Sequence, residues 1–539
     1  MSRYPAGATP GLGTDRTRVA AAVLLVLSML LLAGWWQAGR PVELPAAGSM
    51  PLQCVSYAPS ASAEAPGDDV SRANIERDLR QLAQRFRCVR TYSVSHGLDA
   101  VPQIARGLGL RVLLGVWISG DAATNEREIA RAVATARRER TVIDAIIVGN
   151  EVLLRHELPA SKLAPLIERV GRETGLPVTY ADVWGRWIAN RELARSVSFV
   201  TVHILPYWDD EPVPASVVMP YVESLYDELQ AHFPGKALFV GETGWPSAGK
   251  PRSDLEPGRV NQARYLRSFT ALAERRGIRY NLIEAYDQPW KRAHEGTVGG
   301  HWGILDARGN EKFSWTGPVV ESPHARWVVT ASVALAALGA LFGGLLGGPR
   351  RFRAAVVLAS CAIFATCVAA RQFDFVRAAN ITWADWTFTL LVAACGWAAF
   401  AFAMRGLLRG SIDHRLLPRA VTLLLLAACA YASLGLVLAG RHRDLPVWLF
   451  LPAVVAFVAA SWMDPAGRVR TLLERRATEE TLLAAWLALS GMLVLFSEGV
   501  ASRLALGWAA SCTALGLSLL LPLVLQSRRN QRPTQHAGR

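Results

Sequence analysis

The chain has 539 residues, 51% of them hydrophobic, and a formal net charge of +14. It is too long for one ordinary domain and too apolar for a wholly soluble protein. The charge alone would fit a nucleic-acid-binding protein, but residues 50–320 hold 33 Lys and Arg against 32 Asp and Glu, a net of +1. Most of the excess is arginine that flanks apolar segments. This pattern indicates membrane topology and excludes nucleic acid as the partner.

An apolar run of transmembrane length occupies residues 19–36. Residues 1–18 are polar, carry three arginines and are predicted to form a cytoplasmic tail. A cleaved signal peptide is the alternative. The run ends in Trp35 and Trp36, and tryptophan is enriched at membrane interfaces, so the pattern favours a transmembrane anchor. Residues 37–49, with two prolines and two glycines, are predicted to form a linker.

Residues 50–322 alternate short apolar runs with longer amphipathic stretches. Ser71 and Asn125 are expected to be N-caps of two of the helices. The short runs predict eight strands, at 53–57, 88–93, 111–117, 142–151, 177–182, 198–207, 237–242 and 280–287. Eight strands, most of them separated by a helix, predict an α/β fold of the (β/α)8 TIM-barrel type. A doubly wound fold fits less well because no glycine-rich phosphate turn follows the first strand.

The chain becomes apolar again after residue 323, and residues 327–526 are predicted to form an all-α membrane domain. About seven transmembrane helices are expected, at 327–347, 354–370, 384–404, 419–440, 446–463, 480–497 and 503–526. With the N-terminus in the cytoplasm, the inside segments carry 18 Arg and the short outside loops carry 5. This orientation follows the positive-inside rule. It places residues 50–322 outside the cytoplasm and the tail 527–539 inside.

The seven cysteines show no metal-ligand spacing, and five of them lie within the apolar spans. Cys54 and Cys88 each precede a valine at equivalent positions of the first two predicted strands. If these strands are parallel neighbours in register, the two residues can form a disulfide in an oxidising compartment. A pair of reduced core thiols is the open alternative.

Two glutamates lie at the ends of predicted strands. Glu151, in VGNEV, ends the fourth strand, and Glu242, in GETGWPS, ends the seventh. Since the carboxyl ends of barrel strands meet at one face, both side chains should reach one pocket. A retaining glycosidase needs two carboxyl groups about 5–5.5 Å apart, one as acid/base and one as nucleophile. Two acids on a barrel rim can also be coincidence, but Asn150 favours the enzyme because its amide can bind a sugar hydroxyl beside the reacting carbon.

At these motifs the chain resembles glycoside hydrolase family 17, the β-1,3-glucanases and β-1,3-glucanosyltransferases. Within that family it is similar to bacterial membrane-anchored proteins of β-(1,3)/(1,6)-glucan synthesis. The resemblance covers residues 50–320 and rests on VSYAPS, VRTYS, VGNEV, ILPYW, GETGWPSAG, IEAYDQPWK and HWGILD. It implies that Glu151 is the acid/base and Glu242 the nucleophile. The EAYDQPWK segment departs from plant members, which leaves the acceptor, water or another sugar, open.

Other strand ends supply side chains that could bind substrate. Phenols at the ends of the first two strands can orient a carboxylate, and rings after the sixth and seventh can stack on sugars, with core packing as the alternative. Charged residues after the eighth strand would complete a polar wall. His203 and His301 are expected to be hydrogen-bonding residues rather than metal ligands. The predicted substrate-binding residues are Asn150, Tyr57, Tyr92, Tyr207, Trp208, Trp245, Glu284, Asp287 and Lys291.

The predicted function is that of a retaining enzyme that remodels or cleaves β-1,3-glucan at the outer face of the inner membrane. The expected partners are β-glucan, the lipid bilayer and a separate membrane glucan synthase, because no cytoplasmic loop is long enough for a nucleotide-sugar polymerase. No metal and no cofactor are expected, since the two carboxyls suffice for the chemistry. The alternative is a non-catalytic glucan-binding or export subunit.

Overall fold

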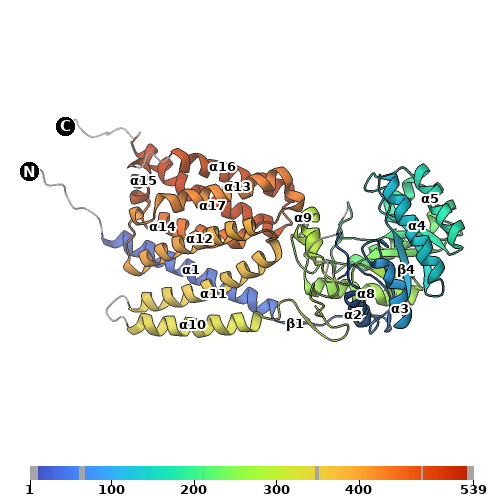
Figure 1. The fold of residues 1–539 in the computed structure, drawn as a ribbon. Coiled ribbons are helices and arrows are strands. Elements are labelled where there is room, and N and C mark those ends of the chain that lie inside the picture. Colours follow the sequence, from blue (N-terminus) through green and yellow to red (C-terminus); the bar gives the residue numbers. More distant parts are fainter. Residues whose placement is uncertain (1–9, 60–66, 211, 346–350, 475–477, 531–539) are drawn as a thin grey trace, which may run out of the picture. The chain divides into compact units, whose positions relative to one another are not determined.

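The computed structural model divides the chain into two compact units, shown in Figure 1. The barrel unit is Pro41–Glu321, and the helical unit joins Met1–Arg40 to Ser322–Arg539. The structure describes residues 10–59, 67–210, 212–345, 351–474 and 478–530. Residues 1–9 and 531–539 of the two predicted tails, and the last residue of the VSYAPS motif, lie outside these ranges.

Eight parallel strands close into a barrel in chain order, which confirms the predicted TIM-barrel fold. The strands are β2 (Leu52–Ser56), β3 (Phe86–Arg90), β4 (Arg111–Val116), β5 (Ile143–Asn150), β6 (Val178–Val183), β7 (Val200–His203), β8 (Leu238–Thr243) and β9 (Tyr280–Leu282). β7 and β9 are much shorter than the predicted strands at 198–207 and 280–287. β7 stops before Pro206, which cannot donate to a ladder, and after β9 the backbone of Glu284 and Asp287 bonds to Trp302 and Leu305 instead.

Helices follow most of the strands, and N-cap residues were predicted for two of them. The helices of the barrel unit are α2 (Arg72–Leu82), α3 (Val101–Gly107), α4 (Ala122–Arg138), α5 (Ala160–Thr174), α6 (Trp184–Ala189), α7 (Val218–His232), α8 (Arg259–Arg276) and α9 (Arg292–Glu295). Ser71 caps α2 as predicted, accepting from the Asn74 N–H. Asn125 is not a cap: Asp121 accepts from the Thr124 N–H and starts α4 earlier, while the Asn125 amide oxygen accepts from the Ser119 N–H.

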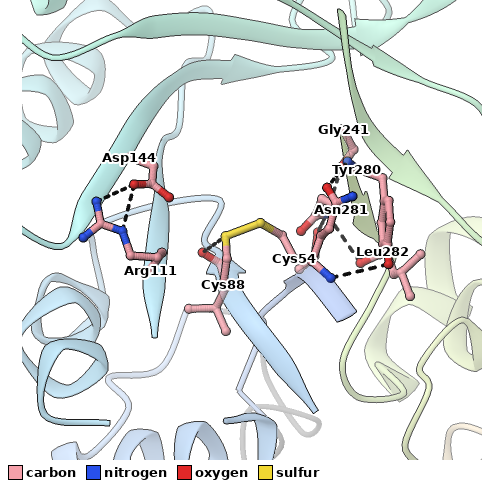
Figure 2. Close-up of a disulfide and its surroundings, with 11 residues drawn as sticks. Cys54, Cys88, Arg111, Asp144, Gly241, Tyr280, Asn281 and Leu282 are labelled. Atoms are coloured by element: carbon pink, nitrogen blue, oxygen red, sulfur yellow. Dashed lines mark hydrogen bonds and ion pairs between the residues drawn. A yellow bond between two sulfur atoms is a disulfide. The ribbon is translucent and has the colours of Figure 1, made fainter. Parts of the chain in front are cut away.

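The first two barrel strands are joined by a disulfide, shown in Figure 2. Cys54 and Cys88 are direct partners in the register of β2 and β3, with a Cα–Cα distance of 4.4 Å. This resolves the open alternative in favour of the disulfide. Side chains alternate between faces along a strand, so Ser56 and Arg90, two positions further on, share the face of the disulfide.

The helical unit contains several helices of membrane-spanning length. They are α1 (Pro10–Ala38), α10 (Ala325–Leu345), α11 (Arg351–Ala379), α12 (Trp383–Arg409), α13 (Arg419–Ala439), α14 (Val447–Met463), α15 (Pro465–Glu474), α16 (Thr478–Glu498) and α17 (Arg503–Asn530). Among the described residues, seven helices are long and apolar enough to cross a membrane, or eight if the bent pair α14 and α15 is one span. The interval between the predicted spans 446–463 and 480–497 contains a helix, α15, which bends by 103° from α14.

The N-terminal helix packs within the helical unit. The Ser28 hydroxyl donates to the Ser360 carbonyl, at 2.9 Å, and the Trp35 indole donates to the Cys367 carbonyl, at 3.0 Å. Trp35 is only 1% exposed, so it packs between helices and does not lie at an open interface. β1 (Pro41–Val42) pairs antiparallel with β10 (Val319–Val320), and the chain thus enters and leaves the barrel unit side by side. The barrel unit is an insertion between two parts of one helical unit.

Candidate active site

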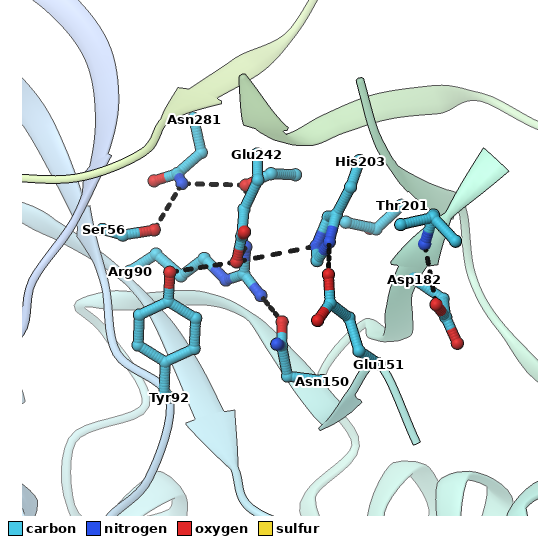
Figure 3. Close-up of polar contacts among 12 residues, drawn as sticks. Ser56, Arg90, Tyr92, Asn150, Glu151, Asp182, Thr201, His203, Glu242 and Asn281 are labelled. Carbon is cyan, nitrogen blue, oxygen red and sulfur yellow. Dashed lines mark hydrogen bonds and ion pairs between the residues drawn. The ribbon is translucent and has the colours of Figure 1, made fainter. Parts of the chain in front are cut away.

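The Glu242 side chain is held from several sides at the end of β8, as Figure 3 shows. Its Oε1 accepts from the Arg90 guanidinium at 3.0 Å and from the Tyr92 hydroxyl at 2.9 Å. Burial raises the pKa of Tyr92 well above its ordinary value, and the charge of Glu242 raises it further. The phenol therefore keeps its proton and donates. Only 5% of the Glu242 side chain is exposed, so the carboxylate is nearly sealed from solvent.

Arg90 organises this end of the barrel. Besides Glu242, its guanidinium donates to the Gly241 carbonyl at 2.7 Å and to the Asn150 amide oxygen at 2.5 Å. The same Gly241 carbonyl accepts from the Asn281 amide at 2.8 Å, and Asn281 also donates to Ser56. Sequence reasoning missed Arg90. The available signal was an arginine two positions after Cys88 in an apolar strand, since a buried charge requires a partner.

Glu151 lies immediately after β5 in an unusual backbone conformation. Its φ is +52°, in the left-handed region that non-glycine residues rarely adopt. Gly149, two residues earlier, has a φ of +88°, and a Cβ there would lie 2.8 Å from Val152. The Glu151 side chain is 23% exposed, against 5% for Glu242. The turn thus delivers one carboxylate with partial access to solvent beside one that is sealed.

His203, at the end of β7, lies between the two carboxylates. Its Nδ1 is 2.9 Å from Glu151 Oε1, and its Nε2 is 3.7 Å from Glu242 Oε1. The ring is fully buried, and it makes the hydrogen bond expected of it. One side-chain oxygen of each glutamate and one His203 nitrogen lie within 4.8 Å of one another. These three residues are also the group with cation-ligand geometry among the described residues, although a cation there would lie next to Arg90.

The surroundings of Glu151 act on its pKa in opposite directions. Burial raises the pKa, but the hydrogen bond from His203 and the charges of His203, Arg90 and Arg155 lower it, and the net pKa is below the ordinary value. The His203 hydrogen bond and the nearby positive charges thus stabilise the carboxylate form of Glu151.

A second set of buried charges follows β9. Lys291 donates to Glu284 at 2.8 Å. Burial raises the pKa of Glu284 to about 7, against the lowering effect of Lys291. The other Glu284 oxygen is buried and has no hydrogen-bond partner among the described residues. Glu284 and Lys291 thus lie where the sequence predicted a polar wall.

Asp287 is tied into the loops rather than free to bind. Its carboxylate accepts from Lys312 at 2.5 Å and from the Gly303 N–H at 3.0 Å. The His301 Nδ1 lies 3.6 Å from its second oxygen. Lys312 also donates to Ser247, five residues after Glu242. This network fixes the loops after β8 and β9 against each other.

The predicted aromatic residues occupy different environments. Tyr57 is buried and donates to Asp78, away from Glu242. Tyr207 and Trp245 are 1% and 0% exposed, and their rings pack edge to face at 5.4 Å. None of these three offers a free face for a sugar, and their predicted binding role is not supported by this placement. Trp208 is partly exposed and stacks on Trp302, so part of its surface is accessible.

Comparison with known proteins finds sequence relatives of the barrel unit. Residues 54–303, nearly the whole barrel unit, match the model of the BtgE/BtgC glycoside hydrolase domain. A glucan 1,3-beta-glucosidase of Saccharomyces cerevisiae is 24% identical over 267 residues, covering 45% of this chain and 85% of that protein. A glucan 1,3-beta-glucosidase of Candida albicans is 27% identical over 269 residues, covering 46% and 86%.

Comparison with solved structures gives a further match. The glycoside hydrolase family 17 beta-1,3-glucanosyltransferase of Rhizomucor miehei is 24% identical, covers 50% of this chain and 97% of that one, and gives a TM-score of 0.44. By its sequence match, the barrel unit is similar to a glycoside hydrolase domain.

Proposed function

We propose that the barrel unit is a retaining enzyme that acts on β-1,3-glucan, with Glu242 as nucleophile and Glu151 as acid/base. The observation that carries the proposal is the spacing of the two carboxylates, whose nearest side-chain oxygens lie within 4.8 Å. Retaining glycosidases place their carboxyl groups about 5–5.5 Å apart, whereas inverting enzymes need roughly 6.5–9.5 Å to admit a water. The glucan 1,3-beta-glucosidases among the relatives support the choice of substrate.

Each held side chain has a step in this mechanism. Glu242 attacks the anomeric carbon and forms an ester, while Glu151 gives its proton to the departing glycosidic oxygen. Glu151 then takes the proton of an acceptor hydroxyl, whose oxygen attacks the same carbon and releases the Glu242 carboxylate. Arg90 and Tyr92 orient the attacking carboxylate. Asn150, its amide oxygen fixed by Arg90, presents its NH₂ group to the sugar hydroxyl beside the reacting carbon.

The site of action is proposed to be the outer face of the inner membrane. Several apolar helices of spanning length and the distribution of arginine support a multi-pass protein with cytoplasmic termini. The Cys54–Cys88 disulfide supports an oxidising compartment for the barrel unit. In this setting the enzyme remodels glucan, by branching, elongation or cyclisation, or cleaves it. A separate membrane synthase supplies the polymer.

Incubation of the full chain in detergent with laminari-oligosaccharides tests the proposal. The wild-type protein should give products that Glu242→Gln does not give. Products longer than the substrate would identify transfer, and only shorter ones hydrolysis. Identical profiles for both proteins would refute the enzyme and leave a glucan-binding or export subunit.

A further inference from the structure

Arg155, four residues after Glu151, clamps the backbone that carries the acid/base. Its Nε and Nη2 donate to the Asn150 carbonyl at 3.2 and 3.0 Å. That carbonyl belongs to the peptide unit whose N–H is the N–H of Glu151, and this N–H donates to the Ala181 carbonyl at 2.8 Å. The peptide unit that enters Glu151 is therefore bound at both its ends.

The backbone that Arg155 holds includes a residue in an unusual conformation, Glu151. Non-glycine residues rarely adopt a left-handed conformation, and Glu151 adopts it at φ +52°. Such residues persist where the surrounding contacts over-determine them. Rotation of this peptide unit would swing the Glu151 side chain away from the glycosidic oxygen. The Glu151 carbonyl also accepts from the Arg155 N–H, at 2.8 Å, which closes the turn.

Arg155 is itself held by a neighbouring loop. Its Nη2 donates to the Ile118 carbonyl at 2.9 Å, and its guanidinium lies 4.3 Å from the centre of the Trp117 ring. Its Nη1 donates to Glu157 at 2.8 Å, and Glu157 in turn accepts from the Gly120 N–H at 2.7 Å. The loop after β4 is thus the fixed support, and Arg155 transmits its position to the end of β5. The planar guanidinium offers five N–H donors in a fixed geometry, so it can bind both carbonyls and Glu157 at once.

We propose that Arg155 is a positioning residue for proton transfer by Glu151, an inference that rests on the acid/base role proposed above. Arg155 has no direct contact with Glu242 in the described structure, where Arg90 and Tyr92 hold that carboxylate. Its loss should therefore impair the step that needs a positioned acid and spare the attack by Glu242.

The test compares two donors with the full chain in detergent. Laminaripentaose has a poor leaving group that needs protonation, and a 2,4-dinitrophenyl β-laminaribioside has one that does not. For Arg155→Gln, kcat/KM for laminaripentaose should fall about 30- to 100-fold, as expected for a misplaced catalytic group. The kcat/KM for the dinitrophenyl donor, which reports the first step only, should stay within about threefold of wild type.

Arg140→Gln is the matched control, since Arg140 also binds two carbonyls, those of Thr174 and Gly175. Arg140 precedes β5 and the two carbonyls precede β6, so neither lies at the strand ends that carry the carboxylates. Arg140→Gln should leave both donors unchanged. Glu157→Gln, which weakens the anchor without removing Arg155, is the second variant should Arg155→Gln not fold. It should lower kcat/KM for laminaripentaose about threefold more than it lowers kcat/KM for the dinitrophenyl donor.

Equal losses for both donors, or no loss for either, would overturn the role of Arg155 while leaving the proposed function intact. A wild-type protein that turns over neither donor would instead refute the proposed function.

Discussion

The ends of β8 and β5 each carry one carboxylate, yet they hold it in opposite ways. Glu242 lies within strand β8, is 5% exposed and accepts from two side-chain donors. Glu151 lies one residue past its strand in a left-handed conformation, is 23% exposed and accepts from His203 alone among the side-chain hydrogen bonds of the described residues. A nucleophile must stay charged and point one way, while an acid/base must exchange protons with solvent. The two environments match these two tasks.

The first way to break this contrast is to remove the nucleophile. Glu242→Gln keeps the shape but cannot form the ester, so activity should fall by at least about 10⁴-fold with laminaripentaose and with the dinitrophenyl donor alike. Initial rates of both reactions measure this. A Glu242→Gln protein that retained turnover of the activated donor would show that the attacking group lies elsewhere.

Removal of the acid/base should have a smaller and more selective effect. Glu151→Gln should lower kcat/KM for laminaripentaose by about 10²- to 10⁴-fold, the usual contribution of general acid–base catalysis. The dinitrophenyl donor should form the glycosyl-enzyme almost normally, and added azide should then yield a β-glycosyl azide. Recovery of the α-glycosyl azide would contradict the assignment. A sugar bound to Glu242 through its α face leaves only the β face of the anomeric carbon open to azide.

Arg90 should be nearly as sensitive as the acid/base, because it binds Glu242, Gly241 and Asn150 at once. Arg90→Lys keeps the charge but loses the fork, and kcat should fall about 100-fold with both donors. Arg111→Lys, at an exposed ion pair with Asp144, is the control and should leave kcat unchanged. A loss confined to laminaripentaose would place Arg90 with the acid/base instead.

His203 sharpens the contrast through pH. Its hydrogen bond and charge lower the pKa of Glu151, so His203→Leu should raise that pKa. The acid must be protonated in the free enzyme, and activity is lost as pH rises through its pKa. The descending limb of the kcat/KM profile should therefore move to higher pH. An unshifted limb would remove His203 from this role.

The disulfide should affect stability more than catalysis. Cys54 and Cys88 close a loop of 34 residues, and a double alanine variant should lose about 3–4 kcal/mol of unfolding free energy. Calorimetry should show a lower Tm for the barrel transition, while kcat well below that temperature should change less than twofold. A large fall in kcat at low temperature would mean that the disulfide also holds Ser56 and Arg90 in place.

The barrel was predictable because each of its strands is indicated by a short stretch of sequence. Short apolar runs at regular spacing predict the strands, and residues after each run predict the rim, which brings Glu151 and Glu242 together without any knowledge of packing. The register of Cys54 with Cys88 followed from the same pattern. What failed at this level were exact ends, such as the true cap at Asp121 in place of Asn125.

The missed contacts depend on positions that the sequence does not encode locally. Arg90 meets Glu242 across 152 residues, and Arg155 binds backbone carbonyls, which have no sequence signature. Ser56 pairs with Arg90, so Tyr57, one residue past β2, and Tyr92, two residues past β3, lie on opposite faces. Tyr92 reaches Glu242, whereas Tyr57 donates to Asp78 on α2. The packing of α1 against α11 is equally a tertiary fact, carried by Trp35 and Ser28.

The most direct test of the central claim is to trap the glycosyl-enzyme. A 2-deoxy-2-fluoro-β-laminaribiosyl donor with a dinitrophenyl leaving group should form the ester and slow its breakdown, and mass spectrometry of the peptides would locate the added sugar. The account predicts the adduct on Glu242, and none in Glu242→Gln. Turnover of laminaripentaose without any adduct, with the α-anomer as first product, would contradict it.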